Sequence, residues 1–381
     1  MGIWILRFFC GTSKYRIRLP DGARKTVFSA LDTLEILIRK VAPGMTSAVA
    51  QLYETFPFPS PAEDAPLMDM VADQLPFVLR DGDDLDGWEV LDAGCGTGSI
   101  LVALARRYPK ARFTGVDACR RSLDIARRCA ERHGVTNVEL VHGTMPELSL
   151  QRRFDMAVCC GVLHHLPSPR AGLQWLTEHL TDDGLIYLWL YDAVGEHGRM
   201  LDRELVQLLT SPDNPEGGLT TIRELGLELS LADYGFPVGW TGTALTTAEQ
   251  DVADADAFLN PVVLPMRFAD MPELFAGLPL TWLAADRVFH PGGIGLVDLA
   301  GTEAGNGGAV FVRPEDLFDR PGLRERVREL GNLDRLRAIE LRLRPTGFEV
   351  LAGRGAGLDR CLPRIAGNLL PYGDGPEPGA R

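Results

Sequence analysis

Apolar segments alternate with helical segments between residues 88 and 192, and no other feature of the chain constrains its fold as strongly. The apolar segments are WEVLDAG, ARFTGVDA, VELVHG, FDMAVCCGVL and GLIYLWLYD (88–94, 111–118, 138–143, 154–163 and 184–192). The helical segments are 98–109, 119–134 and 169–180. Nearly continuous apolar strands separated by helices indicate a mostly parallel sheet covered on both faces. We therefore predict an α/β fold of the Rossmann-like, doubly wound type, with ligands at the carboxyl ends of the strands.

The remaining patterns divide the chain into further segments. Turn signals and hairpin-like alternation predict an N-terminal hairpin-helix element, and weaker helical patterns after the fifth strand predict a helical insert. The Gly-rich stretch 290–308 is expected to be flexible, 320–340 reads as a charged amphipathic stretch, and the tail 371–381 is expected to be disordered. The predicted boundaries are 1–45 for the hairpin-helix element, 46–195 for the ligand-binding domain, 196–285 for the helical insert and 286–381 for a C-terminal extension.

Composition limits the possible partners and compartment. The 381 residues carry a net charge of −13, which makes nucleic acid an unlikely partner over any broad surface. No apolar run reaches the roughly 18–20 residues of a membrane span. The seven cysteines are odd in number and show no C-x-x-C spacing, which favours free thiols in a reducing cytoplasm and predicts no metal site. The sequence does not indicate an oligomeric state.

The stretch VLDAGCGTGSI, residues 90–100, joins the first predicted strand to a helix through a glycine-rich turn. Such a turn gives a ligand close approach to the backbone and free N–H groups at the start of a helix. A phosphate-binding P-loop is excluded because the required Lys is missing, and a dinucleotide pattern fails because Ser99 stands where the third Gly belongs. Asp92 precedes the first glycine by two residues, so it would repel a pyrophosphate and suit a ligand that carries an ammonium and a sulfonium group.

This stretch resembles motif I of the class I S-adenosylmethionine-dependent methyltransferases. Later segments follow the order of that family: FTGVDAC resembles its second motif, VHGTMPEL the third, FDMAVCCGVLHHLPSP the fourth and GLIYLWLYD the fifth. The resemblance covers residues 45–195 and implies that S-adenosyl-L-methionine is the cofactor.

The resemblance also implies roles for individual residues. The loop glycines would bend under the methionine part of the cofactor, Asp92 would hold its amino group, and Asp117 would accept hydrogen bonds from both ribose hydroxyls. Thr144 stands where many members have an Asp near the adenine amine, so its hydroxyl or the neighbouring backbone would replace that contact. The expected cofactor-binding residues are Asp92, Gly94, Cys95, Gly96, Thr97, Gly98, Asp117, Ala118, Thr144, Gly161 and Val162.

His164 and His165 follow the fourth strand and are candidate general bases for an acceptor hydroxyl or amine. The alternative is that this pair only caps the turn or packs on the cofactor. A looser resemblance, carried by YETFPFPSP, GEHGRMLDRELVQLL and DADAFLNPVVLPMRFADMPELF, is to a bacterial subgroup with a Tyr- and Pro-rich segment ahead of the glycine loop. It suggests that Tyr53, Phe56 and Phe58 form a lid over the cofactor, with plain interdomain core as the alternative for these three rings. It also suggests that Arg199 and the insert 196–285, as a substrate or lid region, form the acceptor pocket, with a surface ion pair as the alternative for Arg199.

The predicted function is S-adenosylmethionine-dependent methyl transfer to an oxygen or nitrogen atom of a small-molecule acceptor. RNA or protein also stays open as the acceptor, although the acidic composition disfavours RNA. Two alternative functions remain open from the sequence. One is a nicotinamide-dependent oxidoreductase, and the other is a methyltransferase-like scaffold that binds the cofactor or a partner without turnover.

Overall fold

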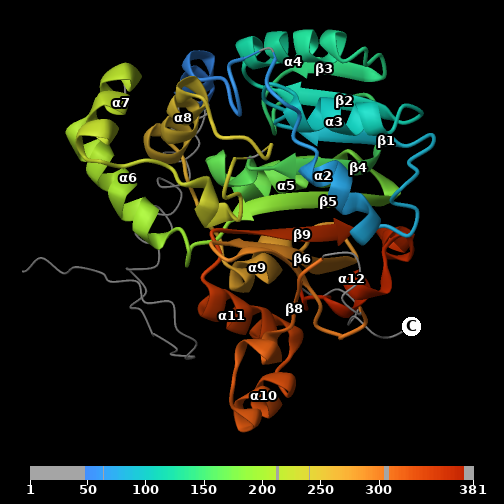
Figure 1. Cartoon of the computed structure of the whole chain (residues 1–381). Coiled ribbons are helices and arrows are strands. Elements are labelled where there is room, and N and C mark those ends of the chain that lie inside the picture. Colours follow the sequence, from blue (N-terminus) through green and yellow to red (C-terminus); the bar gives the residue numbers. More distant parts are fainter. Residues whose placement is uncertain (1–47, 63, 212–213, 240, 304–308, 373–381) are drawn as a thin grey trace, which may run out of the picture. The chain divides into compact units, whose positions relative to one another are not determined.

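A computed structural model describes residues 48–62, 64–211, 214–239, 241–303 and 309–372 (Figure 1). The chain divides into two units, Met1–Gly44 and Met45–Arg381, and the described residues all belong to the second. The predicted hairpin-helix element at 1–45 and nearly all of the tail expected to be disordered lie outside the described residues. Among the helices of the described ranges, none is long and apolar enough to cross a membrane.

A mixed sheet forms the centre of the second unit. Its nine strands lie in the order β3-β2-β1-β4-β5-β9-β6-β7-β8. The strands are β1 Glu89–Ala93, β2 Arg112–Asp117, β3 Val138–His142, β4 Phe154–Cys160, β5 Leu180–Tyr191, β6 Trp282–His290, β7 Gly293–Val297, β8 Phe311–Val312 and β9 Gly347–Gly353. The first five are mutually parallel, so their carboxyl ends share one edge. This arrangement confirms the predicted Rossmann-like α/β fold.

Helices cover both faces of the sheet. On one face lie α2 Met70–Gln74, α3 Ser99–Arg107, α4 Arg120–Arg132 and α12 Pro363–Gly367; on the other lie α5 Pro169–Glu178, α9 Met271–Phe275 and α11 Asn332–Leu343. Alternate strand residues supply the two cores, as Val90 packs with the first group of helices and Leu91 with the second. Both faces are therefore buried, which explains why the strands are apolar almost without interruption.

The C-terminal residues complete the same sheet. Strand β9 lies between β5 and β6 and is antiparallel to both, and β7 pairs with β6. A buried ion pair joins two of these strands, because Arg287 Nε lies 2.5 Å from Glu349 Oε2. The expectation that 290–308 is flexible throughout was wrong, since this stretch contains β7. The described part of 286–381 thus contributes β7, β8, β9 and part of β6 to the sheet.

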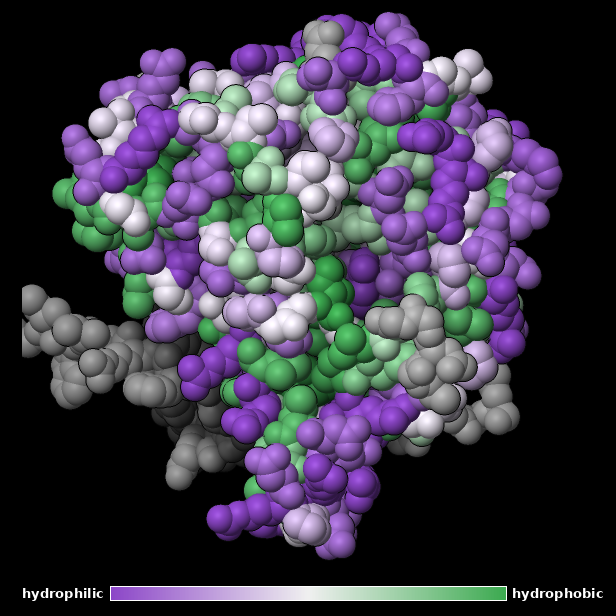
Figure 2. Space-filling view, viewed as in Figure 1, coloured by the Kyte–Doolittle hydropathy of each residue, from purple (hydrophilic) through white to green (hydrophobic). Residues whose placement is uncertain are grey.

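A helical region follows β5, near the carboxyl ends of the parallel strands (Figure 1). It contains α6 His197–Leu209, α7 Pro215–Glu224, α8 Thr247–Asp254 and a π-helical turn, η4 Ala255–Leu259, which continues α8. Its core includes Leu52 from the helical segment 48–55 and Tyr191 from β5. Helix α6 has four exposed leucines, Leu201, Leu205, Leu208 and Leu209. Apolar residues are visible at the left of Figure 2, where Figure 1 places α6 and α7.

Short helices and one longer helix connect these parts. The 3-10 turns are η1 Leu75–Phe77, η2 Leu163–His165, η3 Leu231–Tyr234, η5 Phe268–Asp270, η6 Pro314–Leu317 and η7 Gly355–Arg360. Helix α10 Pro321–Arg328 precedes α11, so the charged amphipathic stretch forms two helices separated by Gly331.

Candidate active site

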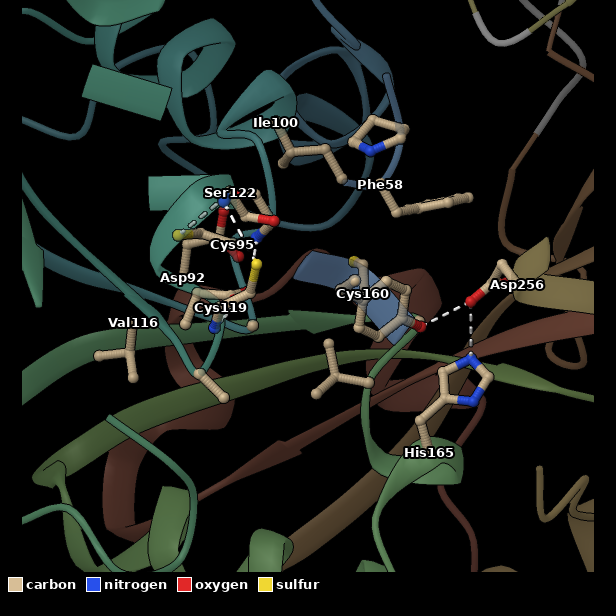
Figure 3. A pocket seen from close by; sticks show the side chains of 18 of the residues that line it. Phe58, Asp92, Cys95, Ile100, Val116, Cys119, Ser122, Cys160, His165 and Asp256 are labelled. Carbon is tan, nitrogen blue, oxygen red and sulfur yellow. Dashed lines mark hydrogen bonds and ion pairs between the residues drawn. The ribbon is translucent and has the colours of Figure 1, made fainter. Parts of the chain in front are cut away.

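A cavity of about 190 Å³ lies at the carboxyl ends of the parallel strands. The glycine loop after β1, the tips of β2, β4 and β5, and the segment 49–59 line it, together with two residues of the helical region, Phe236 and Asp256. Figure 3 shows the side chains of this cavity, with Asp92 and Cys119 on one side and His165 and Asp256 on the other. The site is thus built where parallel α/β sheets bind their ligands.

The glycine loop after β1 has a backbone that only glycine adopts without strain. Gly94, Gly96 and Gly98 have φ of +80°, +52° and +81°, in the left-handed region. A Cβ atom at Gly96 would lie 2.5 Å from the carbonyl oxygen of Phe58, and one at Gly94 would lie 2.4 Å from Val162. The loop therefore packs against the segment around Phe58 on one side while it faces the cavity on the other.

Asp92 is a buried acidic residue near the end of β1. Its side chain is 4% exposed, and its Oδ2 atom has no hydrogen-bond partner among the residues that the structure describes. Burial, and secondarily the nearby carboxylate of Asp117, raise the pKa of Asp92 to about 7. An unpaired carboxylate oxygen in a cavity fits the ammonium group of a methionine-type ligand, because such a group would supply the missing donor and the compensating charge.

Asp117 at the end of β2 is held by backbone donors. Its Oδ2 accepts a hydrogen bond from the N–H of Gly96, and its Oδ1 accepts one from the N–H of Cys119, both at 2.8 Å. Burial raises the pKa of Asp117, while these backbone hydrogen bonds oppose the rise. The carboxylate is fixed beside the glycine loop, and its remaining lone pairs are available to hydroxyl donors.

The structure places most of the predicted cofactor-binding residues around one cavity. Those that line it are Asp92, Gly94, Cys95, Gly96, Asp117, Ala118, Thr144, Gly161 and Val162. Thr97 and Gly98 do not line it, contrary to expectation. The Thr97 N–H donates to the carbonyl of Phe58 at 3.0 Å, and Gly98 is the residue from which α3 begins. These two residues therefore shape the loop from behind.

The two histidines after β4 occupy different environments. His165 lines the cavity; its Nδ1 lies 2.8 Å from the carbonyl oxygen of Val262, and its Nε2 lies 3.6 Å from Asp256 Oδ1. His164 is fully buried outside the cavity, stacks on Tyr191 and accepts the Tyr191 backbone N–H at its Nδ1. Burial lowers the pKa of both side chains, so both imidazoles are neutral near pH 7. Only His165 is placed to accept a proton from a bound ligand.

Asp256 is the site residue that the sequence reasoning missed. It lies in the π-helical turn, is 4% exposed, and accepts hydrogen bonds from the hydroxyl of Tyr53 at 2.6 Å and of Tyr191 at 3.2 Å. The Asn260 side-chain amide donates to the Tyr53 hydroxyl at 3.0 Å. π-Helical turns occur often at functional sites. The quoted segment DADAFLNPVV contained both polar residues, but their spacing along a regular helix gave no sign of the π turn.

The aromatic residues predicted to form a lid divide into two groups. Tyr53 and Phe58 line the cavity, whereas Phe56 packs into the core of the helical region and does not line it. Arg199 also lies outside the cavity lining. Its guanidinium pairs with Glu196, donates to the carbonyl of Ala257 at 2.8 Å and lies 4.6 Å from the centre of the Tyr191 ring. Arg199 thus forms a largely buried ion pair behind the cavity wall.

The protein is of the Rossmann-like cofactor-binding class. Its doubly wound sheet carries a glycine-rich loop after β1, and the adjacent strands β1 and β2 each end near an acidic residue, Asp92 and Asp117. Residues 90–184 match the family described as methyltransferase domain. The chain is a class I S-adenosylmethionine-dependent methyltransferase, and S-adenosylmethionine is its cofactor. The nicotinamide-dependent oxidoreductase is not favoured.

Individual relatives agree with this assignment. An uncharacterized protein of Synechococcus sp. is 28% identical over 82% of this chain and 72% of its own length. A ubiquinone biosynthesis O-methyltransferase of Leptothrix cholodnii is 33% identical over 27% of this chain, and an (S)-coclaurine N-methyltransferase of Papaver somniferum is 31% identical over 27%. The matches span 44% and 29% of those two enzymes, less than half of their lengths.

The structure of PKMT2 from Rickettsia typhi has a related fold. Its TM-score is 0.50, with 18% sequence identity over 73% of this chain and 50% of that chain. At this identity the likeness concerns the fold alone.

Proposed function

We propose that the protein transfers a methyl group to an oxygen or nitrogen atom of a small-molecule acceptor that enters the same cavity. The observation that carries this proposal is the composition of the cavity wall. The wall joins the glycine loop with Asp92 and Asp117 to a second polar group formed by Tyr53, His165 and Asp256. The first group suits the cofactor, and the second is left for the acceptor.

The relatives support the choice of acceptor atom. The two that have specific names are an O-methyltransferase and an N-methyltransferase. One name refers to the biosynthesis of ubiquinone and the other to coclaurine, and ubiquinone and coclaurine are small molecules. A cavity of about 190 Å³ also suits a small acceptor, because most of a small ligand's surface is buried in a concave site.

Each residue then has a defined part in binding. Asp92 Oδ2 would accept a hydrogen bond from the cofactor's ammonium group. The glycine backbone would permit close approach of its methionine part, and Asp117 would accept hydrogen bonds from the ribose hydroxyls. Thr144 lies at the cavity wall to contact the adenine. When bound, the cofactor supplies an electrophilic methyl group on a positively charged sulfur. Holding the acceptor in line with that methyl group supplies much of the rate.

The proton of the acceptor leaves by way of His165 in this proposal. Its Nδ1–H donates to the Val262 carbonyl, which leaves Nε2 as the basic nitrogen. Asp256 lies 3.6 Å from Nε2 and stabilises the imidazolium once the proton has been transferred. Phe58 and Tyr53 contribute their rings to the cavity wall.

The proposal is tested by measuring binding and turnover separately. Calorimetry with S-adenosylhomocysteine is expected to show binding to the wild-type protein and a loss of at least about tenfold in affinity for Asp117→Ala. Asp124→Ala is the matched control, because Asp124 is a surface residue of α4 that pairs with Arg127. Release of S-adenosylhomocysteine from S-adenosylmethionine is then followed with panels of phenols, alcohols and amines.

Two outcomes contradict the proposal in different ways. Binding of a nicotinamide dinucleotide in place of S-adenosylhomocysteine would reject the cofactor assignment. Tight binding of S-adenosylhomocysteine without turnover of any acceptor would favour a scaffold that binds the cofactor and does not catalyse transfer.

A further inference from the structure

The charged groups that line the cavity are all acidic. They are Asp92, Asp117 and Asp256, and no Lys or Arg is found among the lining residues in the described part of the chain. The first two belong to the cofactor's side. Asp256 is left as the single formal charge that faces the acceptor, so a negatively charged acceptor is disfavoured and a positively charged one is attracted.

Aromatic rings line the cavity together with Asp256, and two of them, Tyr53 and Tyr191, contact it through their hydroxyls. The lining includes Tyr53, Phe58, Trp189, Tyr191 and Phe236. The faces of such rings attract cations, and a ring cluster with a carboxylate is a common site for ammonium groups. In Figure 3, Asp256 and His165 face each other.

The hydrogen bonds of Asp256 leave space for one more donor. Its Oδ1 accepts from Tyr53, has Asn260 Nδ2 at 3.5 Å and faces His165. Its Oδ2 accepts from Tyr191 at 3.2 Å and from no other side chain among the described residues. A carboxylate offers about four acceptor positions. Both tyrosines use their hydroxyl protons on this carboxylate, so they hold it in place without neutralising its charge.

The nearby cations are engaged elsewhere. Arg199 pairs with Glu196 and donates to Ala257, and Arg203 donates to the carbonyl of Asn260. Neither side chain lines the cavity. Within the described residues, the charge of Asp256 is therefore not met by a contacting Lys or Arg side chain, and the basic side chain that faces it is His165.

We propose that the methyl acceptor is an amine that enters as its ammonium ion, is held by Asp256 and the surrounding aromatic rings, and is methylated on nitrogen. This inference rests on the proposed function and narrows the acceptor to one chemical class.

The chemical step follows from the positions of the two polar side chains. The bound ammonium gives one proton to His165 Nε2, and the lone pair of the resulting amine becomes the nucleophile. The nitrogen–carbon bond to the methyl group forms while the carbon–sulfur bond breaks, and the electron pair of the broken bond remains on sulfur. The product nitrogen carries the positive charge, and the imidazolium of His165 lies beside Asp256 until it loses its proton to solvent.

The test uses binding probes that do not depend on knowing the natural acceptor. The full-length protein is saturated with S-adenosylhomocysteine and titrated with benzyltrimethylammonium, benzyl alcohol or benzoate. The cation is expected to bind at least about tenfold more tightly than either of the other two. Asp256→Asn keeps the shape of the side chain and is expected to weaken binding of the cation by at least about tenfold.

A matched control separates charge from folding. Asp254→Asn changes a buried acid two residues away, which accepts from the Leu229 N–H and does not line the cavity. It is expected to leave binding of the cation unchanged. S-adenosylhomocysteine is expected to bind Asp256→Asn within about threefold of wild type, because Asp92 and Asp117 hold the cofactor.

The outcomes are distinguishable from those of the proposed function. Equal or tighter binding of benzyl alcohol or benzoate overturns the amine assignment while it leaves methyl transfer intact. Unchanged binding of the cation by Asp256→Asn overturns it as well. Failure of the wild-type protein to bind S-adenosylhomocysteine rejects the cofactor's role before the acceptor is tested.

Discussion

Tyr53 and Asp256 are joined by a hydrogen bond of 2.6 Å although 203 residues separate them in the sequence. The bond ties the helical segment ahead of the glycine loop to the π-helical turn that follows α8. Burial, together with the charge of Asp256, raises the pKa of Tyr53 well above its usual value, so the phenol stays protonated and acts as a donor. Both partners line the cavity, so the bond fixes one part of its wall.

Tyr53→Phe removes this donor while it keeps the ring. We expect kcat/KM for the acceptor to fall by about tenfold, which corresponds to the loss of one hydrogen bond to a charged group. The affinity for S-adenosylhomocysteine is expected to change less than about twofold. Tyr53→Ala removes the ring as well, and calorimetry is expected to show weaker cofactor binding if the ring acts as a lid; unchanged affinity would remove the lid assignment.

Tyr108→Phe provides the comparison for these variants. The Tyr108 hydroxyl donates to the carbonyl of Gly82 at 2.7 Å, and this residue does not line the cavity. Its substitution is expected to lower the free energy of unfolding by about 1 kcal/mol and to leave kcat/KM unchanged. An equal loss of activity in both variants would mean that Tyr53 acts only through stability.

The fold from β1 to β5 could be predicted from the sequence, because strands that are close in the sequence pair with one another there. From β1 to α6, every predicted strand and helix is present within a few residues, because each strand pairs with another of the same apolar, parallel group. The glycine loop could also be predicted, since its positive φ angles require glycine at fixed spacing.

Pairing between distant segments could not be predicted in the same way. Strand β9 inserts between β5 and β6, and its partner β5 lies more than 150 residues earlier. Asp256 belongs to the cavity because a π turn rotates it toward Tyr53, and no periodicity in the sequence marks such a turn. Arg199, in contrast, was predicted to line the acceptor pocket, but it forms an ion pair with Glu196 outside the cavity lining.

Gly96 is expected to be intolerant of any side chain. Gly96→Ala would place a Cβ atom 2.5 Å from the backbone oxygen of Phe58, at a φ of +52°. The loop would have to move, which would displace the N–H that donates to Asp117. We expect calorimetry to show at least about a 100-fold loss of affinity for S-adenosylhomocysteine.

Gly134→Ala is the control that separates backbone strain from the steric contact with Phe58. Gly134 has a φ of +65°, but a Cβ atom there would meet no atom within 4 Å. This variant is expected to lose about 1 kcal/mol in the free energy of unfolding through backbone strain and to bind S-adenosylhomocysteine as the wild type does. Comparable loss of binding in both variants would show that the close approach of Gly96 to Phe58 is unimportant.

The two adjacent histidines are expected to fail in different ways. His165→Ala should lower kcat by about 100-fold or more with little change in the affinity for S-adenosylhomocysteine, because it removes the basic nitrogen at the cavity. His164→Ala should instead lower the free energy of unfolding by about 3 kcal/mol, because it removes a fully buried ring that stacks on Tyr191. Chemical denaturation and single-turnover kinetics on each variant distinguish these effects. A loss of kcat confined to His164→Ala would reverse the assignment.

The affinity for the cofactor is expected to depend on pH through Asp92. Its pKa is raised to about 7 by burial and by Asp117, and only the ionised form can pair with the ammonium of S-adenosylhomocysteine. If binding requires that form, affinity measured by calorimetry should be about tenfold lower at pH 6 than at pH 8, since the ionised fraction falls by about that factor. The stability of the free protein depends on pH in the opposite direction. Because the raised pKa favours the protonated acid, the contribution of Asp92 to stability is largest below the unfolded pKa and is lost as the pH rises toward 7. Asp92→Asn should bind more weakly and lose most of the pH dependence; an Asn variant that kept the tenfold difference would assign it to another group, with Asp117 the first to be tested.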